Sequence, residues 1–228
     1  MAEFSIEIAG DSALILYFSD QPSAAVSKTI QQTQQRLLAA MGGEIVDTVA
    51  SYGSLLVVFD PLKTDYWLLK QQLANISSSQ TDAASDDGRI VTLPVYYGEE
   101  VGLDLADMAV STGLTTEQII DIHQQQTYRV YAIGFAPGFA YLGEVDERIA
   151  APRLATPRLK VPRGAVAIAD RQTAVYPAQS PGGWNIIGRC PQRMFDPSAE
   201  PSMPVTAGDS VQFKAISRDE FIQLGGEL

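Results

Sequence analysis

The sequence predicts two domains, an α+β domain over residues 1–80 and a small β-barrel domain over residues 89–228. In the first part, strand and helix patterns follow the order ββαββα, which is typical of helices packed on one face of an antiparallel sheet. From residue 134 onward, glycine and proline recur too often for long helices, and the short apolar runs between them favour a barrel. Residues 81–88 are small and polar, which is the composition of a linker.

The first domain carries its own start and stop signals. Gly10 and Gly53 each separate two apolar runs and predict β-hairpins. Apolar residues at helical spacing predict two helices, the first of them closed by Gly42 and Gly43. The predicted elements are strands 4–9 and 13–19, helix 23–41, strands 45–52 and 55–60, and helix 65–76.

The second domain is expected to begin with a strand and two short helices. Thr115 and Gln118 have the spacing of a capping box and predict the start of the second helix. The remaining apolar runs are short, so we expect each of them to form a barrel strand. The predicted elements are strand 90–97, helices 103–112 and 116–126, strand 128–133, and short strands near 161, 166–168, 174–176, 184–187 and 211–213.

Composition and charge exclude several classes of function. The net charge of −11 argues against general nucleic-acid binding, which depends on clustered lysine and arginine. With one cysteine, Cys190, and one histidine, His123, the chain offers no internal disulfide and no metal site of the usual cysteine or histidine type. It also lacks the P-loop, dinucleotide-binding and nucleophile-elbow motifs. No apolar run is long enough to span a bilayer, so we expect a cytoplasmic protein without a membrane partner.

Residues 134–143, with the sequence GFAPGFAYLG, follow a predicted strand and contain closely spaced glycine and proline. Such a path exposes backbone N–H groups, Gly138 among them, to a ligand, and the aromatic side chains could wall a pocket. The alternative is a barrel corner plugged by aromatic residues, which composition alone favours.

Three Pro-Arg pairs recur at a spacing of five residues and place Arg153, Arg158 and Arg163 in a stretch without acidic residues. Guanidinium groups bind carboxylate or phosphate through two parallel hydrogen bonds. In a straight strand, Arg158 would point away from the other two, so all three converge only if the segment bends. The segment is either an anion site or a stiff, solvated surface loop.

Residues 172–184 combine amide, hydroxyl and indole groups with a glycine pair, Gly182 and Gly183. This composition suits a loop that closes over a ligand, with Gln172 and Tyr176 as hydrogen-bonding groups. Trp184 is more often a core or interface anchor. His123, on a helical face with two isoleucines, is more often structural, but as the one group that titrates near neutrality it is a candidate acid or base.

Taken together, these motifs resemble the family of allophanate hydrolase subunit 1, also called the 5-oxoprolinase B subunit, which includes the inhibitor of the sporulation kinase A. The resemblance covers residues 123–213 and rests on an ordered series of short motifs. They are His123, 128–130 (YRV), 134–142 (GFAPGFAYL), the Pro-Arg pairs at 152 and 157, 161–164 (VPRG), 172–173 (QT), 176–177 (YP), 180–184 (SPGGW), 187–189 (IGR), 208–209 (GD) and 211–213 (VQF).

The resemblance implies a ferredoxin-like N-terminal domain and an all-β cyclophilin-like barrel at the C-terminus. It implies a complex with the larger homologous C subunit and a third lactam-utilisation subunit. The implied reaction opens 5-oxoproline to glutamate with hydrolysis of ATP, whose site could lie on a partner subunit. Two alternatives remain open, an inhibitor of a sensor histidine kinase and half of a biotin-dependent urea carboxyltransferase or allophanate hydrolase complex.

Under this resemblance, His123 and Tyr176 are the candidate catalytic residues. Activating a lactam through a phosphorylated oxygen requires cations for the phosphate and N–H donors for a tetrahedral oxyanion. Ala165 stands where the family often has serine, so a serine-dependent contact could not be carried over to this chain. The expected binding residues are Arg153, Arg158 and Arg163 for phosphate, Gly138, Gly182 and Gly183 for the oxyanion, and Gln172 with Tyr176 for the lactam ring or its carboxylate.

Overall fold

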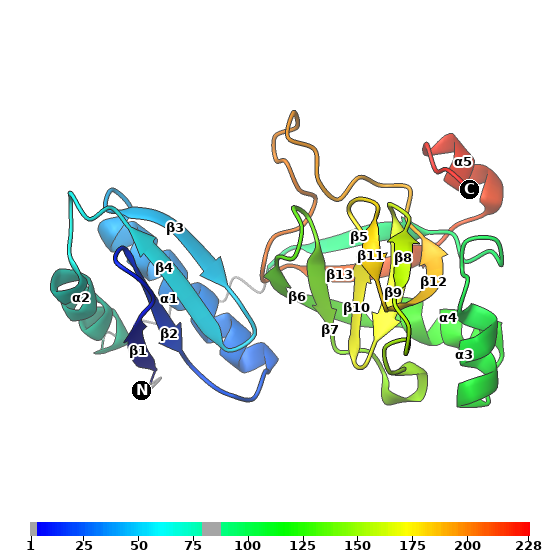
Figure 1. Cartoon of the computed structure of the whole chain (residues 1–228), viewed down its shortest axis with the longest axis horizontal. Coiled ribbons are helices and arrows are strands. Elements are labelled where there is room, and N and C mark those ends of the chain that lie inside the picture. Colours follow the sequence, from blue (N-terminus) through cyan, green and yellow to red (C-terminus); the bar gives the residue numbers. More distant parts are fainter. Residues whose placement is uncertain (1–3, 79–87) are drawn as a thin grey trace. The chain divides into compact units, whose positions relative to one another are not determined.

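The computed structural model describes residues 4–78 and 88–228 (Figure 1). Contacts between residues divide the chain into two compact units, Met1–Asp87 and Gly88–Leu228. Apart from Gly88, the predicted linker of residues 81–88 lies outside the described residues. Within the described residues, no helix is both long and apolar enough to cross a membrane.

The N-terminal unit is a four-stranded antiparallel sheet with two helices, in the predicted element order. The sheet order β1-β2-β4-β3 places β4 between β2 and β3, which are joined through α1. The assignment of this unit to the ferredoxin-like class stays a prediction. The elements are β1 (Ser5–Ile8), β2 (Ala13–Tyr17), α1 (Ala24–Met41), β3 (Ile45–Ala50), β4 (Ser54–Phe59) and α2 (Tyr66–Ser78).

Helix α1 packs through one stripe of its surface against the sheet and α2. Ser23 caps the helix by accepting a hydrogen bond from the Val26 N–H, which satisfies a donor that the first turn leaves free. Ile30 and Leu37 are buried on the stripe, two helical turns apart. Alternate residues of β4 are buried on the same core, as expected for a sheet covered on one side.

The C-terminal unit is a nearly closed barrel of seven strands. The strand order is β12-β9-β10-β7-β6-β13-β5, parallel only between β13 and β5. Two backbone hydrogen bonds between Tyr96, just after β5, and Arg189, in β12, join the outermost strands. The predicted barrel is thereby confirmed, while the cyclophilin-like name stays a prediction. The strands are β5 (Ile90–Val95), β6 (Thr127–Ile133), β7 (Ala140–Gly143), β9 (Ala165–Ala169), β10 (Gln172–Val175), β12 (Asn185–Arg189) and β13 (Ser210–Ala215).

Further short elements surround the barrel. The predicted capping box forms, because the Thr115 hydroxyl accepts from the Gln118 N–H and the Gln118 amide oxygen accepts from the Thr115 N–H. Strand β8 includes the short strand predicted near residue 161, whereas strand β7, strand β11 and the C-terminal helix were not predicted. These elements are α3 (Leu105–Thr112), α4 (Thr116–Gln125), the 3₁₀ helix η1 (Glu147–Ile149), β8 (Arg158–Val161), β11 (Ser180–Gly182) and α5 (Arg218–Gln223).

Strand β9 lies between two apolar cores, and all five of its residues are buried. Val166 and Ile168 contribute to the larger core, which α3 and α4 share. Ala165 and Ala167 point the other way, into a second core built around Phe139. This second core positions the candidate site.

Candidate functional site

A cavity of about 120 Å³ opens on the second core of the barrel unit. Its lining is mainly aromatic, and the residues that line it carry one guanidinium, two phenol hydroxyls and one indole N–H and include two glycines. The lining residues are Phe135, Phe139, Tyr141, Arg153, Tyr176, Pro181, Gly182, Gly183 and Trp184.

Phe139 is the centre of the aromatic wall. Its ring meets Tyr176 and Trp184 edge to face, with centroids 5.3 and 5.7 Å away. Tyr141 and Phe135 add further edge contacts at 4.8 and 5.4 Å. Edge-to-face pairs fix the relative tilt of the rings as well as burying apolar area, so the cavity has a defined shape.

Of the three glycines predicted for the site, Gly182 and Gly183 line the cavity and Gly138 does not. A Cβ atom on Gly182 would lie 2.3 Å from the Tyr176 hydroxyl oxygen, so a side chain at this position would have to displace the tyrosine ring. Gly138 has a φ of +81°, and a Cβ there would lie 2.4 Å from the Met194 carbonyl oxygen. Phe135 also has a positive φ, at 68°, and its side chain is exposed at the rim.

Arg153 is the cation of the cavity. Its guanidinium carbon lies 5.8 Å from the centre of the Trp184 ring, a cation–π contact. Hydrogen bonds to the residues before and after Arg153 hold its loop in place. The Asn185 side chain donates to the Pro152 carbonyl at 2.9 Å, and the Leu154 N–H donates to the Gly183 carbonyl at 2.7 Å. The cation therefore stands on a fixed backbone beside the aromatic wall.

Tyr176 presents a hydroxyl that stays protonated at neutral pH. Burial raises its pKa above the usual value for tyrosine, and the positive charge of Arg153 opposes this only in part. The phenol can therefore donate a hydrogen bond to a ligand but does not serve as a base.

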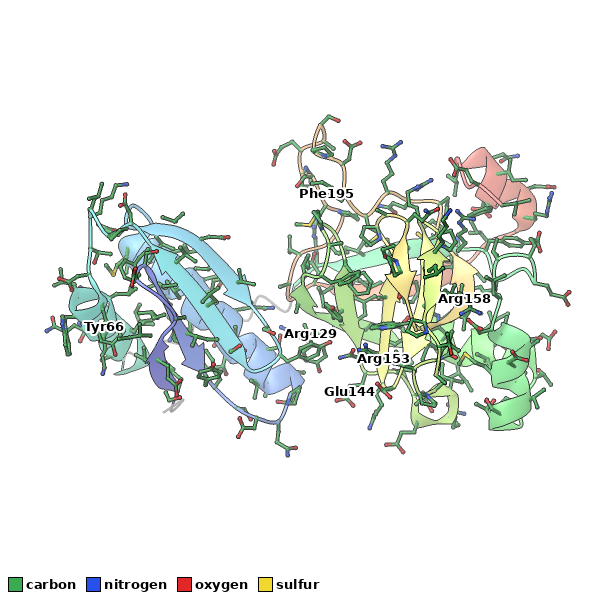
Figure 2. The ribbon with its side chains drawn as sticks, in the orientation of Figure 1. Tyr66, Arg129, Glu144, Arg153, Arg158 and Phe195 are labelled. Atoms are coloured by element: carbon green, nitrogen blue, oxygen red, sulfur yellow. The ribbon has the colours of Figure 1, made fainter. Side chains whose placement is uncertain are left out.

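Arg158 is not part of the cavity. Its guanidinium forms two hydrogen bonds, of 2.9 and 2.6 Å, with the buried carboxylate of Asp104 at the start of α3. Asp104 also accepts from the Ile186 N–H at 2.6 Å. Figure 2 labels Arg153 and Arg158 at separate places on the barrel. The structure therefore gives Arg158 the role of joining β8, α3 and β12.

Arg163 and Gln172 also lie outside the cavity lining. Arg163 precedes β9 and accepts a hydrogen bond at its backbone oxygen from Arg189. Gln172 begins β10 and pairs with Gly143 and Ala169, at the opposite end of that short strand from Tyr176. The three Pro-Arg arginines thus have three different surroundings, and the convergence that a shared anion site would need is not found.

His123 is fully buried in the larger core, stacked on Phe213 with centroids 4.5 Å apart. Thr173 uses its hydroxyl proton on the Ala167 carbonyl, so it accepts from Nε2 of the histidine at 3.1 Å. Tyr97 then donates to Nδ1 at 2.8 Å. Burial lowers the pKa of His123 to about 3, which keeps the ring neutral. These contacts fit a structural role for His123 in the core of the barrel unit.

Two other cavities are larger but less suited to an anionic ligand. One, of about 490 Å³, is lined by Glu144, Asp146 and Glu147 with Arg171, whose guanidinium pairs with two of these carboxylates. The other, of about 430 Å³, lies beside α3 and α4 and includes the carboxylates of Glu99 and Glu117. Among the described residues, no group of three or more His, Cys, Asp or Glu side chains could hold a metal ion.

Sequence reasoning missed Asn185, which holds the Arg153 loop through a contact with a residue 33 positions away that no local pattern reveals. Phe135 was expected among the aromatic walls and does line the cavity, but its positive φ has no sequence signal of its own.

Comparison with known proteins supports one family. A family model for the carboxyltransferase domain, subdomain C and D, matches residues 4–205. A Bacillus subtilis protein named as the B subunit of 5-oxoprolinase is 35% identical over 229 residues, covering 96% of this chain and 95% of its own. A Haemophilus influenzae protein of the same name is 42% identical over 171 residues, covering 75% of this chain and 79% of its own.

Solved structures agree with this similarity. A conserved uncharacterized protein from Pyrococcus horikoshii, PH0987, is 42% identical with a TM-score of 0.58, covering 95% of this chain and 100% of its own. TTHA0988 is 35% identical with a TM-score of 0.80 over 90% of this chain, which spans 40% of that longer protein. The Kluyveromyces lactis urea amidolyase, 18% identical with a TM-score of 0.73 over 96% of this chain and 15% of its own, shares the fold alone.

Proposed function

This chain belongs to the carboxyltransferase-domain family that includes the 5-oxoprolinase B subunits, and we propose that it is the B subunit of an ATP-dependent 5-oxoprolinase. Such a complex opens the lactam ring of 5-oxoproline to give glutamate, ADP and phosphate. The observation that carries the proposal at the level of the site is the aromatic cavity with Arg153 at its edge.

The cavity suits a small, flat carboxylic acid. Its volume of about 120 Å³ is below the roughly 300–1,000 Å³ of pockets for drug-sized ligands. A five-membered lactam ring can lie against the faces of Tyr176 and Trp184, with its carboxylate on the Arg153 guanidinium. The protonated Tyr176 hydroxyl then serves as a hydrogen-bond donor to the lactam, and Gly182 and Gly183 allow the ligand close to the backbone.

None of these three cavities suits a nucleotide. The aromatic cavity is too small, and the two larger ones present carboxylates that would repel a triphosphate. We therefore assign ATP to a partner subunit, and this chain contributes to the lactam side of a shared site. The larger homologous subunit and a third lactam-utilisation protein are the proposed partners.

The proposal is tested by reconstitution. The chain is co-expressed with the larger subunit and the third protein, and glutamate release from 5-oxoproline is measured with and without ATP. We expect release only when all three proteins and ATP are present. Assembled, folded components that release no glutamate would contradict the proposal.

A further inference from the structure

We propose that Arg163 and Arg189 form a second site, separate from the aromatic cavity, that binds a small oxyanion such as phosphate or a carboxylate. Neither residue lines the cavity described above. The proposal rests on their contacts and charges and does not depend on the oxoprolinase activity.

The two arginines are held side by side by the backbone. Arg189 Nε donates to the Arg163 carbonyl at 2.9 Å, and the carbonyl of Gly164, the next residue after Arg163, accepts from the Cys190 N–H at 2.8 Å. A Cβ on Gly164 would lie 2.3 Å from the Cys190 carbonyl oxygen, so the two segments touch because this position is glycine. The positive charge of Arg163 is close enough to lower the pKa of Arg189, after the larger effect of burial.

These guanidiniums lack the partners that other arginines of this chain have. Arg158 and Arg171, for example, form ion pairs with carboxylates at 2.6–2.9 Å. Within the described ranges, neither Arg163 nor Arg189 has a carboxylate within ion-pair distance. Glu227 in the C-terminal tail acts on Arg189 only through its charge, from beyond that distance.

One donor of the pair is also left without an acceptor. Among the described residues, Arg163 Nη1 is buried and has no hydrogen-bond partner. A buried, unsatisfied donor on a charged group is costly, and a second guanidinium beside it adds repulsion. An oxyanion would accept hydrogen bonds from N–H groups on the accessible part of the pair and neutralise the shared charge, which is the usual role of paired arginines.

Both residues are only partly buried, so part of each remains open to a ligand from solvent. The pair lies where β12 meets the end of β5, on the strand edge that closes the barrel. The aromatic cavity belongs to the second core instead. Occupying the oxyanion site would therefore brace the barrel closure without filling the cavity.

Anion binding to the full chain tests the proposal. Inorganic phosphate and acetate are titrated at constant ionic strength against a chloride reference, with affinity measured by calorimetry. We expect phosphate, acetate or both to bind, and Arg163→Gln and Arg189→Gln each to weaken binding at least about tenfold. Arg148→Gln, which removes an exposed arginine paired with Asp146, is the matched control and should leave the affinity unchanged.

The two anions distinguish a phosphate site from a carboxylate site, and either result supports an oxyanion site. Circular dichroism checks that each variant folds. If the glutamine variants do not fold, Arg189→Lys replaces them, because lysine keeps the positive charge but lacks the two parallel N–H donors of the guanidinium. Absence of binding by both anions in the wild type would overturn the proposal. So would binding that is the same in the wild type and in the folded arginine variants.

Discussion

Tyr176 and Gly182 show how one missing side chain shapes the aromatic cavity. The tyrosine hydroxyl occupies the space that a Cβ on residue 182 would need. The sequence drew attention to both residues, but as parts of a flexible loop. The structure instead makes Gly182 part of the short strand β11, so its role is steric.

Replacing Gly182 with alanine tests this contact. We expect Gly182→Ala to displace the Tyr176 ring and to lower kcat/KM for 5-oxoproline in the reconstituted complex at least about tenfold, since small displacements in a site have large kinetic effects. Gly134→Ala is the matched control, because a Cβ at residue 134 meets no atom within 4 Å. Equal kcat/KM for Gly182→Ala and the wild type would show that the reaction does not depend on the position of the Tyr176 ring.

The ion pair of Arg158 with Asp104 is expected to stabilise the barrel unit rather than act on substrate. The Asp104 side chain is 6% exposed, so removing either partner leaves a largely buried charge or donor. We expect Asp104→Ala to lower the free energy of unfolding by about 3 kcal/mol, whereas Arg148→Ala, at an exposed pair, costs about 1 kcal/mol or less.

Unfolding in urea is monitored through the fluorescence of Trp184. The chain has two tryptophans, and Trp67 is 70% exposed in the other unit, so Trp67→Phe leaves Trp184 as the reporter. If Asp104→Ala lowers the free energy of unfolding no more than the Arg148→Ala control does, the ion pair of Arg158 with Asp104 does not have this structural role.

Helix α4 is attached to the barrel by a histidine that titrates far from its usual range. His123 connects α4 with Thr173 in β10 and with Tyr97 just after β5. The sequence placed His123 on a helix face with apolar neighbours, which is correct, but could not identify partners 26 and 50 residues away.

A pH titration of stability tests this arrangement. The unfolded chain takes up a proton at His123 near pH 6.5, while the folded unit does so only near pH 3. Stability should therefore be full above pH 6.5 and fall as the pH decreases below it, by up to about 1.4 kcal/mol per pH unit. His123→Gln should remove this contribution between pH 6.5 and 5, because His123 is the single histidine. An unchanged slope in the variant would contradict the assignment.

Local signals predicted most elements but not the connections between them. Hairpin glycines, the Thr115–Gln118 capping box and the helical spacing in α1 depend on neighbouring residues, and the structure has each of them. Strand β7 was missed because its flanking glycines were assigned to a loop. The partner of Arg158 is Asp104, a residue 54 positions away, and no local pattern contains that information.

Family membership and the cavity of the barrel unit are the two observations on which the proposed function rests. The family is shown by similarity over most of the chain, and the fold places aromatic walls and a fixed cation on one core of the barrel. The sequence predicted Arg153, Tyr176, Gly182 and Gly183 for the site, and these four line the cavity. Their catalytic use stays a prediction.

The effect of Arg153→Ala on the reconstituted complex tests whether the aromatic cavity is the lactam site. The measured quantity is kcat/KM for ATP-dependent glutamate release from 5-oxoproline, with Arg148→Ala as the matched surface control. Losing a charge-assisted contact to the substrate carboxylate should lower kcat/KM about 10- to 100-fold, while assembly with the partner subunits and the control variant stay as in the wild type. An assembled Arg153→Ala complex with wild-type kcat/KM would contradict the assignment of the aromatic cavity to the lactam site.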